Sequence, residues 1–342
     1  MSVLHLLGTS GEGGAETYFL DLVQALHQAG VAQAAAIRRH EARATSLAKS
    51  GASVGVFGFG GPIDLLTKPR VAAFARRHDT RLALAWMNRA ARHTPKGPWA
   101  RVGRLGGYYS LKYYRGFDAL VANTEHIADW VVEQGWPAGR VRYIHNFAAP
   151  PAAGAAAERA ALATPSDAPL LLAMGRLHDA KAHDVALAAL ARLPEAYLWI
   201  AGAGALEAKL KAMADALGVA GRVRFLGWRN DPSALYRAAD VCVFPSRFEP
   251  LGNVVIQAWA HGLPVVAAAS QGPAALIRDG EDGLLVPIDD AEALADATRR
   301  VLEDEALRVR LAAKGSERVA AEFSPAAVVE QWRTLFADLG AG

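Results

Sequence analysis

Short apolar runs alternate with helix-like stretches along most of the chain. In the first half, the runs that predict strands are residues 3–7, 34–38, 53–57, 82–86, 120–122 and 141–144. In the second half they are residues 170–174, 198–201, 223–226, 241–244, 265–268 and 284–286. Several runs are apolar at consecutive positions, which is typical of parallel strands that helices cover on both faces. The pattern predicts an α/β fold with two doubly wound, Rossmann-like domains.

The residues between and after these two series suggest where the domains end. Residues 151–169 are rich in alanine and proline, which neither extend a sheet nor supply much to pack, so they predict a linker. The first domain is then 1–150, the second 170–322, and an amphipathic helix within 323–342 packs back as a brace. Parallel sheets bind ligands beyond the carboxyl ends of their strands, so we expect a ligand in a cleft between the two domains.

Composition narrows the setting of the chain. Among its 342 residues Cys242 is the single cysteine, and it stands in an apolar run, which predicts a buried thiol, no internal disulfide and a reduced, cytoplasmic location. No run of about 18 apolar residues could span a membrane. The net charge of +3 and pI of about 9.0 suit phosphate-bearing partners, and by themselves they do not indicate nucleic acid.

The segment after residue 244 carries the most informative chemistry. Glu249 lies in a polar loop, and Gly252 and Asn253 open a helix whose free N–H groups form an anion site. That helix is apolar nearly all round, yet Asn253, Gln257 and His261 recur every four residues and so share one face. A polar stripe on a buried helix needs hydrogen-bond partners, and a phosphate and a ribose would supply them.

Two more groups of residues follow predicted strands. Arg176 and Lys181 come after the strand 170–174, where a planar guanidinium and an ammonium suit a diphosphate. Gly13 and Gly14 follow the first strand and open a helix, and glycine there permits close backbone approach to a phosphate or sugar. An ordinary strand-to-helix turn would also explain the two glycines.

These segments resemble the retaining GT-B glycosyltransferases of family 4, also known as group 1. Glu249 matches the first glutamate of the family's Glu-x7-Glu motif, and Gln257 stands where the second is expected. The resemblance implies that Glu249 binds the transferred sugar and Gln257 the ribose. It implies that Arg176 and Lys181 bind the donor pyrophosphate, and that the loop of Gly13 and Gly14 lies over the donor phosphates.

The acceptor side is less legible. At the end of the strand 82–86, where many relatives carry a histidine, this chain has Trp86, with Asn88 and Arg89 as substitutes by position only. Residues 96–117 mix tyrosines with arginines and lysines, which suits a peripheral membrane contact and equally suits an ordinary helix face. Lipid-linked and lipopolysaccharide acceptors are frequent in the resembling family.

Two other kinds of site are disfavoured. Gly202 and Gly204 are followed by Glu207 where a dinucleotide fingerprint needs its third glycine. No Asp-x-Asp ends a strand, and His178 with His183 lacks a third ligand, so we expect no metal and no cofactor. The leaving diphosphate would then be neutralised by Arg176, Lys181 and the helix start at Gly252.

The function that these features predict is sugar transfer from a UDP-, GDP- or ADP-sugar to a glycan or lipid-linked acceptor, with retention of configuration. The N-terminal domain would bind the acceptor and the C-terminal domain the donor. Two alternatives stay open: a GT-B sugar-nucleotide epimerase, and a decayed member that binds nucleotide-sugars without catalysis. Nucleic acid is not an expected partner.

Overall fold

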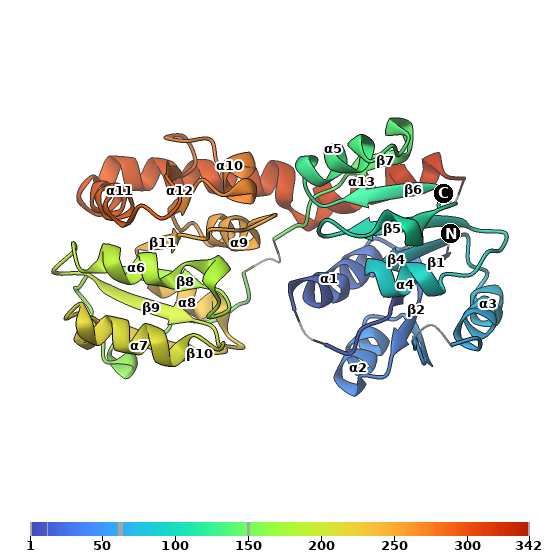
Figure 1. Ribbon diagram of the computed structural model, residues 1–342, viewed down its shortest axis with the longest axis horizontal. Coiled ribbons are helices and arrows are strands. Elements are labelled where there is room, and N and C mark those ends of the chain that lie inside the picture. The colour runs from blue at the N-terminus through green and yellow to red at the C-terminus, as the bar shows by residue number, and fades with distance from the viewer. Residues whose placement is uncertain (1, 12, 61–63, 149–150, 341–342) are drawn as a thin grey trace. The chain divides into compact units, whose positions relative to one another are not determined.

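The computed structural model describes residues 2–11, 13–60, 64–148 and 151–340. The chain divides into two compact units, the first formed by Met1–Asn146 with Pro325–Gly342 and the second by Phe147–Ser324 (Figure 1). Each unit is built on one parallel sheet, as the alternation of apolar runs predicts. Within the described residues, no helix is long and apolar enough to cross a membrane.

The first unit holds a seven-stranded sheet in the order β3-β2-β1-β4-β5-β6-β7. Its strands are β1 (Ser2–Leu7), β2 (Ala32–Arg38), β3 (Ser53–Phe57), β4 (Leu82–Trp86), β5 (Ala100–Leu105), β6 (Ala119–Ala122) and β7 (Val141–Tyr143). Its helices are α1 (Gly14–Gln28), α2 (Glu41–Lys49), α3 (Thr67–Arg77), α4 (Met87–His93), α5 (Glu125–Glu133) and α13 (Pro325–Asp338), with short 3-10 turns at Leu111–Tyr114 and Ala138–Arg140. The strand order reverses between β1 and β4, so the carboxyl ends of these two strands form a topological switch point.

The second unit holds a six-stranded sheet in the order β10-β9-β8-β11-β12-β13. Its strands are β8 (Leu170–Met174), β9 (Tyr197–Ala201), β10 (Val223–Gly227), β11 (Val241–Phe244), β12 (Val265–Ala268) and β13 (Leu284–Val286). Its helices are α6 (His183–Leu190), α7 (Glu207–Ala216), α8 (Pro232–Ala238), α9 (Asn253–Ala260), α10 (Gln271–Leu276), α11 (Ala291–Glu303) and α12 (Glu305–Arg318), with a π-helical turn at Val319–Phe323 and 3-10 turns at Ala160–Leu162, Asp179–Lys181 and Ala220–Arg222. Here the order reverses between β8 and β11.

Alternate residues of the second sheet enter two different cores. Leu171 and Val243 pack with α6, α7 and α11, whereas Leu172 and Phe244 pack with α8 and α9. Because both faces are covered, both sets of side chains are apolar, and this produces the continuous apolar runs seen in the sequence. The first sheet has the same arrangement, with α3, α4 and α5 on one face and α1 on the other.

The strand β5 was missed by the sequence pattern, which assigned its residues to a tyrosine-rich and cation-rich surface. Arg104, the fifth of its six residues, is only 3% exposed. The guanidinium donates hydrogen bonds to the carbonyl oxygen of Ile144 at 2.7 Å and to Oδ1 of Asn146 at 2.6 Å, and it lies over the rings of Tyr18 and Trp332. Burial lowers the pKa of Arg104 to about 10, so the side chain stays charged at neutral pH. The arginine is therefore part of the core and is not a surface cation.

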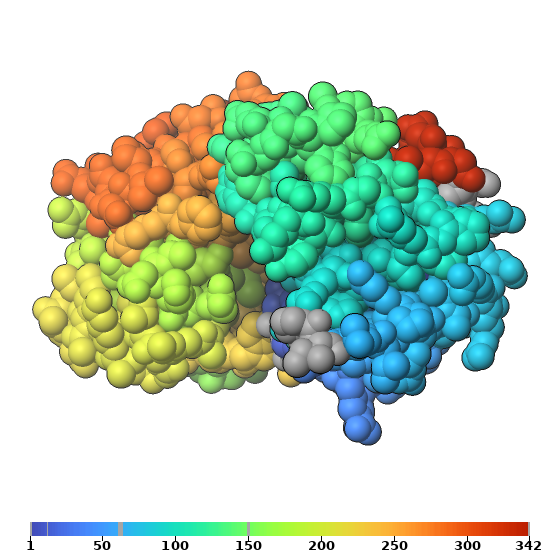
Figure 2. Space-filling model, turned by 45° about the vertical axis from the view of Figure 1, so that its right-hand side comes forward, coloured from blue at the N-terminus to red at the C-terminus, as the bar shows by residue number. Residues whose placement is uncertain are grey.

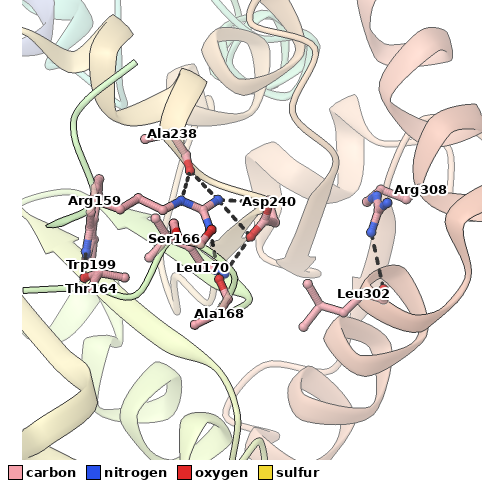
Figure 3. A network of polar contacts seen from close by, with 10 residues as sticks. All are labelled: Arg159, Thr164, Ser166, Ala168, Leu170, Trp199, Ala238, Asp240, Leu302 and Arg308. Atoms are coloured by element: carbon pink, nitrogen blue, oxygen red, sulfur yellow. Dashed lines mark hydrogen bonds and ion pairs between the residues drawn. The ribbon is translucent and has the colours of Figure 1, made fainter. Parts of the chain in front are cut away.

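The described residues of the Ala/Pro-rich stretch, 151–169, belong to the second unit. Arg159 anchors the stretch by donating hydrogen bonds to the carbonyl oxygens of Ala238, Ser166 and Ala168 and by forming an ion pair with Asp240 at 3.0 Å (Figure 3). The same aspartate accepts a hydrogen bond from the N–H of Leu170, the first residue of β8. The stretch thus packs against the second unit, while the C-terminal helix α13 contacts α1 in the first.

Candidate active site

The predicted donor residues of the second unit meet at its topological switch point. Arg176 and Lys181 follow β8, and Glu249 follows β11, the strand beside it in the sheet. Lys181 and Glu249 stand 68 residues apart in sequence, yet Nζ of Lys181 forms a short ion pair with Oε2 of Glu249. This edge of a doubly wound sheet is where such folds bind ligands.

Both partners of this ion pair are largely withdrawn from solvent. The side chain of Lys181 is 20% exposed and that of Glu249 is 13% exposed. Nζ of Lys181 also lies 5.6 Å from the centre of the Phe244 ring, in a cation–π position. The second carboxylate oxygen of Glu249 accepts the backbone N–H of Gly252 at 3.2 Å. The glutamate is therefore held between a lysine and the start of α9.

Arg176 has a different environment from Lys181. It is exposed, and its guanidinium forms neither an ion pair nor a hydrogen bond with the residues that the structure describes. A planar cation with five N–H donors, on the same segment after β8 as a partly buried ammonium, suits a bidentate phosphate ligand.

Two glycines that the sequence analysis set aside shape this edge of the sheet. Gly202 follows β9 with φ 153, and a Cβ atom there would lie 1.9 Å from the carbonyl oxygen of Gly175. A Cβ atom at Gly204 would lie 2.4 Å from the carbonyl oxygen of Leu177. The two glycines let the turn after β9 press against the loop that carries Arg176. Their position directly after a predicted strand was the signal available in the sequence.

The helix α9 carries the predicted polar stripe. Its N-cap, Gly252, is left-handed with φ 84, a conformation that glycine adopts without strain. Gln257 is half-buried, and its side-chain amide forms no hydrogen bond within the described part of the chain. His261 is engaged: Nδ1 lies 2.7 Å from the carbonyl oxygen of Gln257 and Nε2 lies 2.9 Å from Oγ of Ser233. Within this stripe, His261 is therefore already hydrogen-bonded, whereas the side-chain amide of Gln257 has no partner among the described residues.

Arg247 stands two residues before Glu249 but does not share its environment. Its guanidinium forms ion pairs with Asp184 and Asp289 and donates to the carbonyl oxygen of Asp179. These contacts tie the loop after β11 to the segment around α6 and to Asp289, two residues before α11. Arg247 is thus a brace for the loop that holds Glu249.

In the first unit, the glycine loop and the residues after β4 lie at the other switch point. Gly13 is the N-cap of α1 and is fully extended. A Cβ atom at Gly13 would lie 3.0 Å from Oε2 of Glu16, and one at Gly8 would lie 2.9 Å from Cγ of Arg89. Gly14 begins α1 and is exposed. The loop after β1 therefore packs closely against the helix that follows β4.

Trp86, one of the tentative residues for the acceptor, is the last residue of β4. It is 3% exposed, and its ring packs edge-to-face on Phe19 at 5.3 Å, so it belongs to the core beside α1. Asn88 is half-buried, while Arg89 is exposed and reaches the carbonyl oxygen of Phe59 at 3.4 Å. Met87, between the strand and these two residues, has φ 62, a strained value for a non-glycine residue.

Three buried polar atoms near the carboxyl ends of β4 and β6 have no hydrogen-bond partner among the residues that the structure describes. They are Nε1 of Trp86, Oδ1 of Asn88 and Oδ1 of Asn123. Asn123 is 6% exposed and immediately precedes Thr124, the residue whose side chain caps α5. Buried polar atoms normally have hydrogen-bond partners, so this edge of the sheet is suited to a polar ligand such as a sugar.

The stretch proposed from sequence as a membrane contact is divided between core and surface. Arg104 and Tyr114 are buried, and Tyr108 is 38% exposed. The cations and tyrosines of residues 96–117 therefore do not share one exposed face.

Cys242 is buried as expected, and burial raises the pKa of its thiol to about 12. Among the described residues, no group of three or more His, Cys, Asp or Glu side chains could hold a metal ion.

Comparisons with known proteins agree with this geometry. Residues 155–318 match the family model of the group 1 glycosyl transferases. The chain is 40% identical to the lipopolysaccharide core biosynthesis glycosyltransferase LpsE of Rhizobium meliloti (strain 1021), over 96% of each chain. It is 37% identical to LpsD of the same organism, over 98% of each chain.

Solved structures show the same fold at lower identity. HepE of Anabaena in complex with UDP has a TM-score of 0.85 and 22% identity, covering 99% of this chain and all of that one. WaaG, a glycosyltransferase involved in lipopolysaccharide biosynthesis, has a TM-score of 0.71 and 18% identity, with complete coverage of both chains. With its two parallel-sheet units and full-length relatives of this kind, the chain belongs to the group 1 glycosyltransferases and has the GT-B fold.

Proposed function

We propose that this glycosyltransferase transfers a sugar from a nucleotide-sugar to an acceptor in lipopolysaccharide core assembly, with retention of the anomeric configuration. The observation that carries the proposal is the pairing of Lys181 with Glu249 at the switch point of the second sheet. Arg176, on the same segment after β8 as Lys181, is exposed and has no side-chain partner among the described residues. The two full-length relatives, both named lipopolysaccharide core glycosyltransferases, support the acceptor class.

The donor residues have complementary roles in this proposal. Arg176 and Lys181 bind the diphosphate, and Glu249 accepts hydrogen bonds from the hydroxyls of the transferred sugar. Without donor, Lys181 and Glu249 neutralise one another. When the donor binds, Lys181 exchanges Glu249 for the negatively charged diphosphate. Glu249 exchanges Lys181 for neutral sugar hydroxyls, whose hydrogen bonds satisfy its carboxylate oxygens. Gly252 and Asn253 form the start of α9, and we propose that the positive end of the helix dipole there favours the donor phosphates.

Gln257 is the proposed ribose ligand. It lies one turn beyond Asn253 on α9, and its amide has no protein partner among the described residues. A glutamine amide can accept a hydrogen bond from one ribose hydroxyl and donate one to the other. A glutamate carboxylate can accept a charge-assisted hydrogen bond from each of the two. We therefore propose that Gln257 contacts the ribose in the same position as a glutamate would, and binds it more weakly.

Retention needs no covalent enzyme intermediate in the proposed mechanism. An acceptor hydroxyl oxygen attacks the anomeric carbon on the face from which the diphosphate leaves. The bond from that carbon to the phosphate oxygen breaks, its electron pair stays with the diphosphate, and a donor phosphate oxygen takes the acceptor's proton. Arg176 and Lys181 stabilise the charge that develops on the leaving group, which is the task that a divalent cation would otherwise perform. We propose that the reaction needs neither a metal nor a cofactor.

The first unit is the proposed acceptor domain. The unpartnered atoms of Asn88 and Asn123 are available for acceptor hydroxyls, and Arg89 is available for an acidic sugar or a phosphate. We propose that the loop of Gly13 and Gly14 contributes backbone N–H groups to the donor phosphates. Trp86 supports α1 from the core, and its buried Nε1, which has no partner among the described residues, is a further candidate donor to the acceptor.

The test is transfer from a panel of UDP-, GDP- and ADP-sugars to lipopolysaccharide acceptors that lack outer core sugars. UDP-glucose is the first donor to test, because HepE structures contain UDP-glucose and UDP. The anomeric configuration of the product, determined by NMR, shows whether the configuration of the donor sugar is retained. Transfer that persists in EDTA shows that the reaction does not depend on a metal ion. Release of a free sugar without acceptor would instead indicate an epimerase. Tight donor binding without turnover would indicate a non-catalytic binding protein.

A further inference from the structure

Three aromatic side chains form a cluster at the surface of the first unit. They are Tyr108, which follows β5, and His126 and Trp130, which lie one turn apart on α5. The ring of Tyr108 packs edge-to-face with that of Trp130 at 5.2 Å and with that of His126 at 6.0 Å, measured between ring centres. The hydroxyl oxygen of Tyr108 lies 3.2 Å from Nδ1 of His126. The three side chains therefore hold one another in place.

Much of this aromatic cluster is open to solvent. Tyr108 is 38% exposed, His126 is exposed and Trp130 is half-buried. Figure 2 shows the segments that carry these residues, in teal and green, at the surface of the first unit. Each side chain has an apolar ring and a polar atom at its rim. A surface of this composition suits a ligand that is itself apolar on one face and polar around its rim.

The aromatic cluster adjoins a buried amide. The strands β5 and β6 end in register, with Leu105 opposite Ala122, and the carbonyl oxygen of Leu105 accepts the N–H of Asn123 at 3.1 Å. A Cβ atom at Gly106 would lie 3.6 Å from Nδ2 of Asn123. Asn123 is 6% exposed, and its Oδ1 has no hydrogen-bond partner among the residues that the structure describes. The segments that leave the two strands thus bring this amide and the aromatic cluster to the same end of the sheet.

The polar edge that includes this amide is longer than one sugar ring. Two further buried atoms that lack a hydrogen-bond partner within the described ranges, Oδ1 of Asn88 and Nε1 of Trp86, lie at the carboxyl end of β4. The strands β4 and β6 flank β5, so their ends are two strand spacings apart, about 10 Å. The helix α5 begins directly after β6 and extends this edge. A ligand that reaches from β4 to the aromatic cluster therefore has more than one ring.

We propose that Tyr108, His126 and Trp130 form a second acceptor subsite, which binds the sugar next to the one that is glycosylated. This inference rests on the proposed function, and it makes the acceptor an oligosaccharide of at least two sugars. The apolar face of a pyranose ring would stack on the cluster, because its C–H groups are attracted to the negative face of an aromatic ring. A hydroxyl at the rim of the same sugar would donate a hydrogen bond to Oδ1 of Asn123.

The alternative is a cluster that only supports α5. That helix is already anchored by Ile127 and Val131, which are fully buried, and by the side chain of Thr124, which caps its start. A supporting role would also make the loss of Tyr108 equally harmful for every acceptor. A sugar subsite would make that loss harmful only for acceptors long enough to reach it, and this difference can be measured.

Two acceptors that share a terminal sugar test the subsite. One is the delipidated core oligosaccharide of a truncated lipopolysaccharide, and the other is the methyl glycoside of its terminal sugar alone. The parent enzyme should prefer the oligosaccharide, as measured by the ratio of the two kcat/KM values. Tyr108→Ala should lower this ratio about twofold to tenfold, which is the contribution of a typical aromatic contact. Tyr108→Phe should retain the ratio, because it keeps the ring.

Two further variants complete the experiment. Trp130→Leu keeps an apolar side chain against the core and should also lower the ratio. Val132→Ala is the control, because Val132 is 38% exposed on α5 and lies outside the aromatic cluster, so the ratio should not change. Thermal melting shows that each variant is folded. Calorimetric titration of the delipidated oligosaccharide into enzyme without donor measures affinity directly, and Tyr108→Ala should lower that affinity by the same factor.

The outcomes separate this inference from the proposed sugar transfer. A ratio that Tyr108→Ala leaves unchanged, or a parent enzyme with no preference for the oligosaccharide, would overturn the subsite and leave the proposed transfer standing. A parent enzyme that glycosylates neither acceptor would contradict the proposed function, and the titration then decides. Affinity that is lost in Tyr108→Ala would support an oligosaccharide site, whereas equal affinity in both proteins, or no binding, would refute it.

Discussion

Breaking the contact between Lys181 and Glu249 is the most direct test of the proposed donor site. The change we consider is Lys181→Met, which keeps the length and apolar contacts of the side chain and removes the ammonium. Glu249→Gln is the partner variant, and it keeps an oxygen that can accept the N–H of Gly252. Together with the double variant they form a complete double-mutant cycle.

The expected effect on stability follows from the burial of the two side chains. Removing one member of a fully buried ion pair costs about 3 to 5 kcal/mol, and removing one member of an exposed pair costs about 0 to 1 kcal/mol. With side-chain exposures of 20% and 13%, this pair lies between these limits, so each single variant should lose about 1 to 2 kcal/mol. For a unit of this size the melting temperature then falls by roughly 2 to 8 °C. The double variant should lose less than the sum, because no charge remains unpaired.

The expected effect on turnover is larger than the effect on stability. Removing one group that stabilises developing charge typically costs about a hundredfold to a thousandfold in rate. Lys181→Met should therefore reduce kcat by that factor at temperatures where the protein is fully folded. The control is Lys211→Met, which breaks the exposed pair of Lys211 with Glu207 on α7 and should change neither melting nor turnover.

The measurements are calorimetric melting of all four cycle members and initial rates with a radiolabelled nucleotide-sugar. Stability losses that add up in the double variant would show that Lys181 and Glu249 do not interact. A folded Lys181→Met variant with parental kcat would exclude the lysine from stabilising the leaving group, and with it the central step of the proposed mechanism.

Three further predictions follow from other contacts. Gln257→Glu should retain or raise affinity for the nucleotide-sugar and Gln257→Ala should lower it about tenfold, and calorimetric titration showing identical affinities for the two would remove Gln257 from the ribose site. Gly202→Ala should destabilise the second unit and weaken UDP binding, because the new Cβ would collide with the carbonyl of Gly175 at 1.9 Å; an unchanged melting curve would contradict this packing. Burial raises the pKa of Asp21 to about 6, so its charge opposes folding above that pH, and Asp21→Asn should stabilise the first unit at pH 8 by at most about 3 kcal/mol. That advantage should vanish as the pH falls from about 6 to about 4, whereas Asp129→Asn, at an exposed position of α5, should show no such dependence.

The sequence was sufficient to predict most strands because both faces of each sheet are buried. Runs such as Leu170–Met174 are apolar at every position, and a pattern of this kind needs no knowledge of distant residues. The strand β5 lacks that property, since Arg104 interrupts it. The hydrogen-bond partners that make this arginine acceptable in the core stand about forty residues later, at Ile144 and Asn146. The pattern of apolar and polar residues within the strand cannot indicate hydrogen-bond partners that lie so far away in the sequence.

The stretch 151–169 shows the same limit. Alanine and proline correctly indicate that it forms no strand, but composition says nothing about what holds it. A single residue, Arg159, fixes it to the end of α8 at Ala238 and to Asp240, the residue before β11. Composition alone does not distinguish Arg159 from any other charged residue of a linker, because its four acceptors lie in two segments that are separate in sequence.

In the proposed donor site, some of the residues that the sequence motifs single out lie close together in space, whereas a neighbour of the motif in sequence lies elsewhere. The reversal of strand order between β8 and β11 brings Lys181 and Glu249 together, and each was identifiable because it follows a predicted strand. Arg247 is nearer to Glu249 in sequence but turns to Asp184 and Asp289. Sequence proximity to a motif therefore does not decide which side chains meet the substrate. The end of the strand and the direction of the turn after it decide that. Here they direct Arg247 to the aspartates that hold the loop and Glu249 to Lys181.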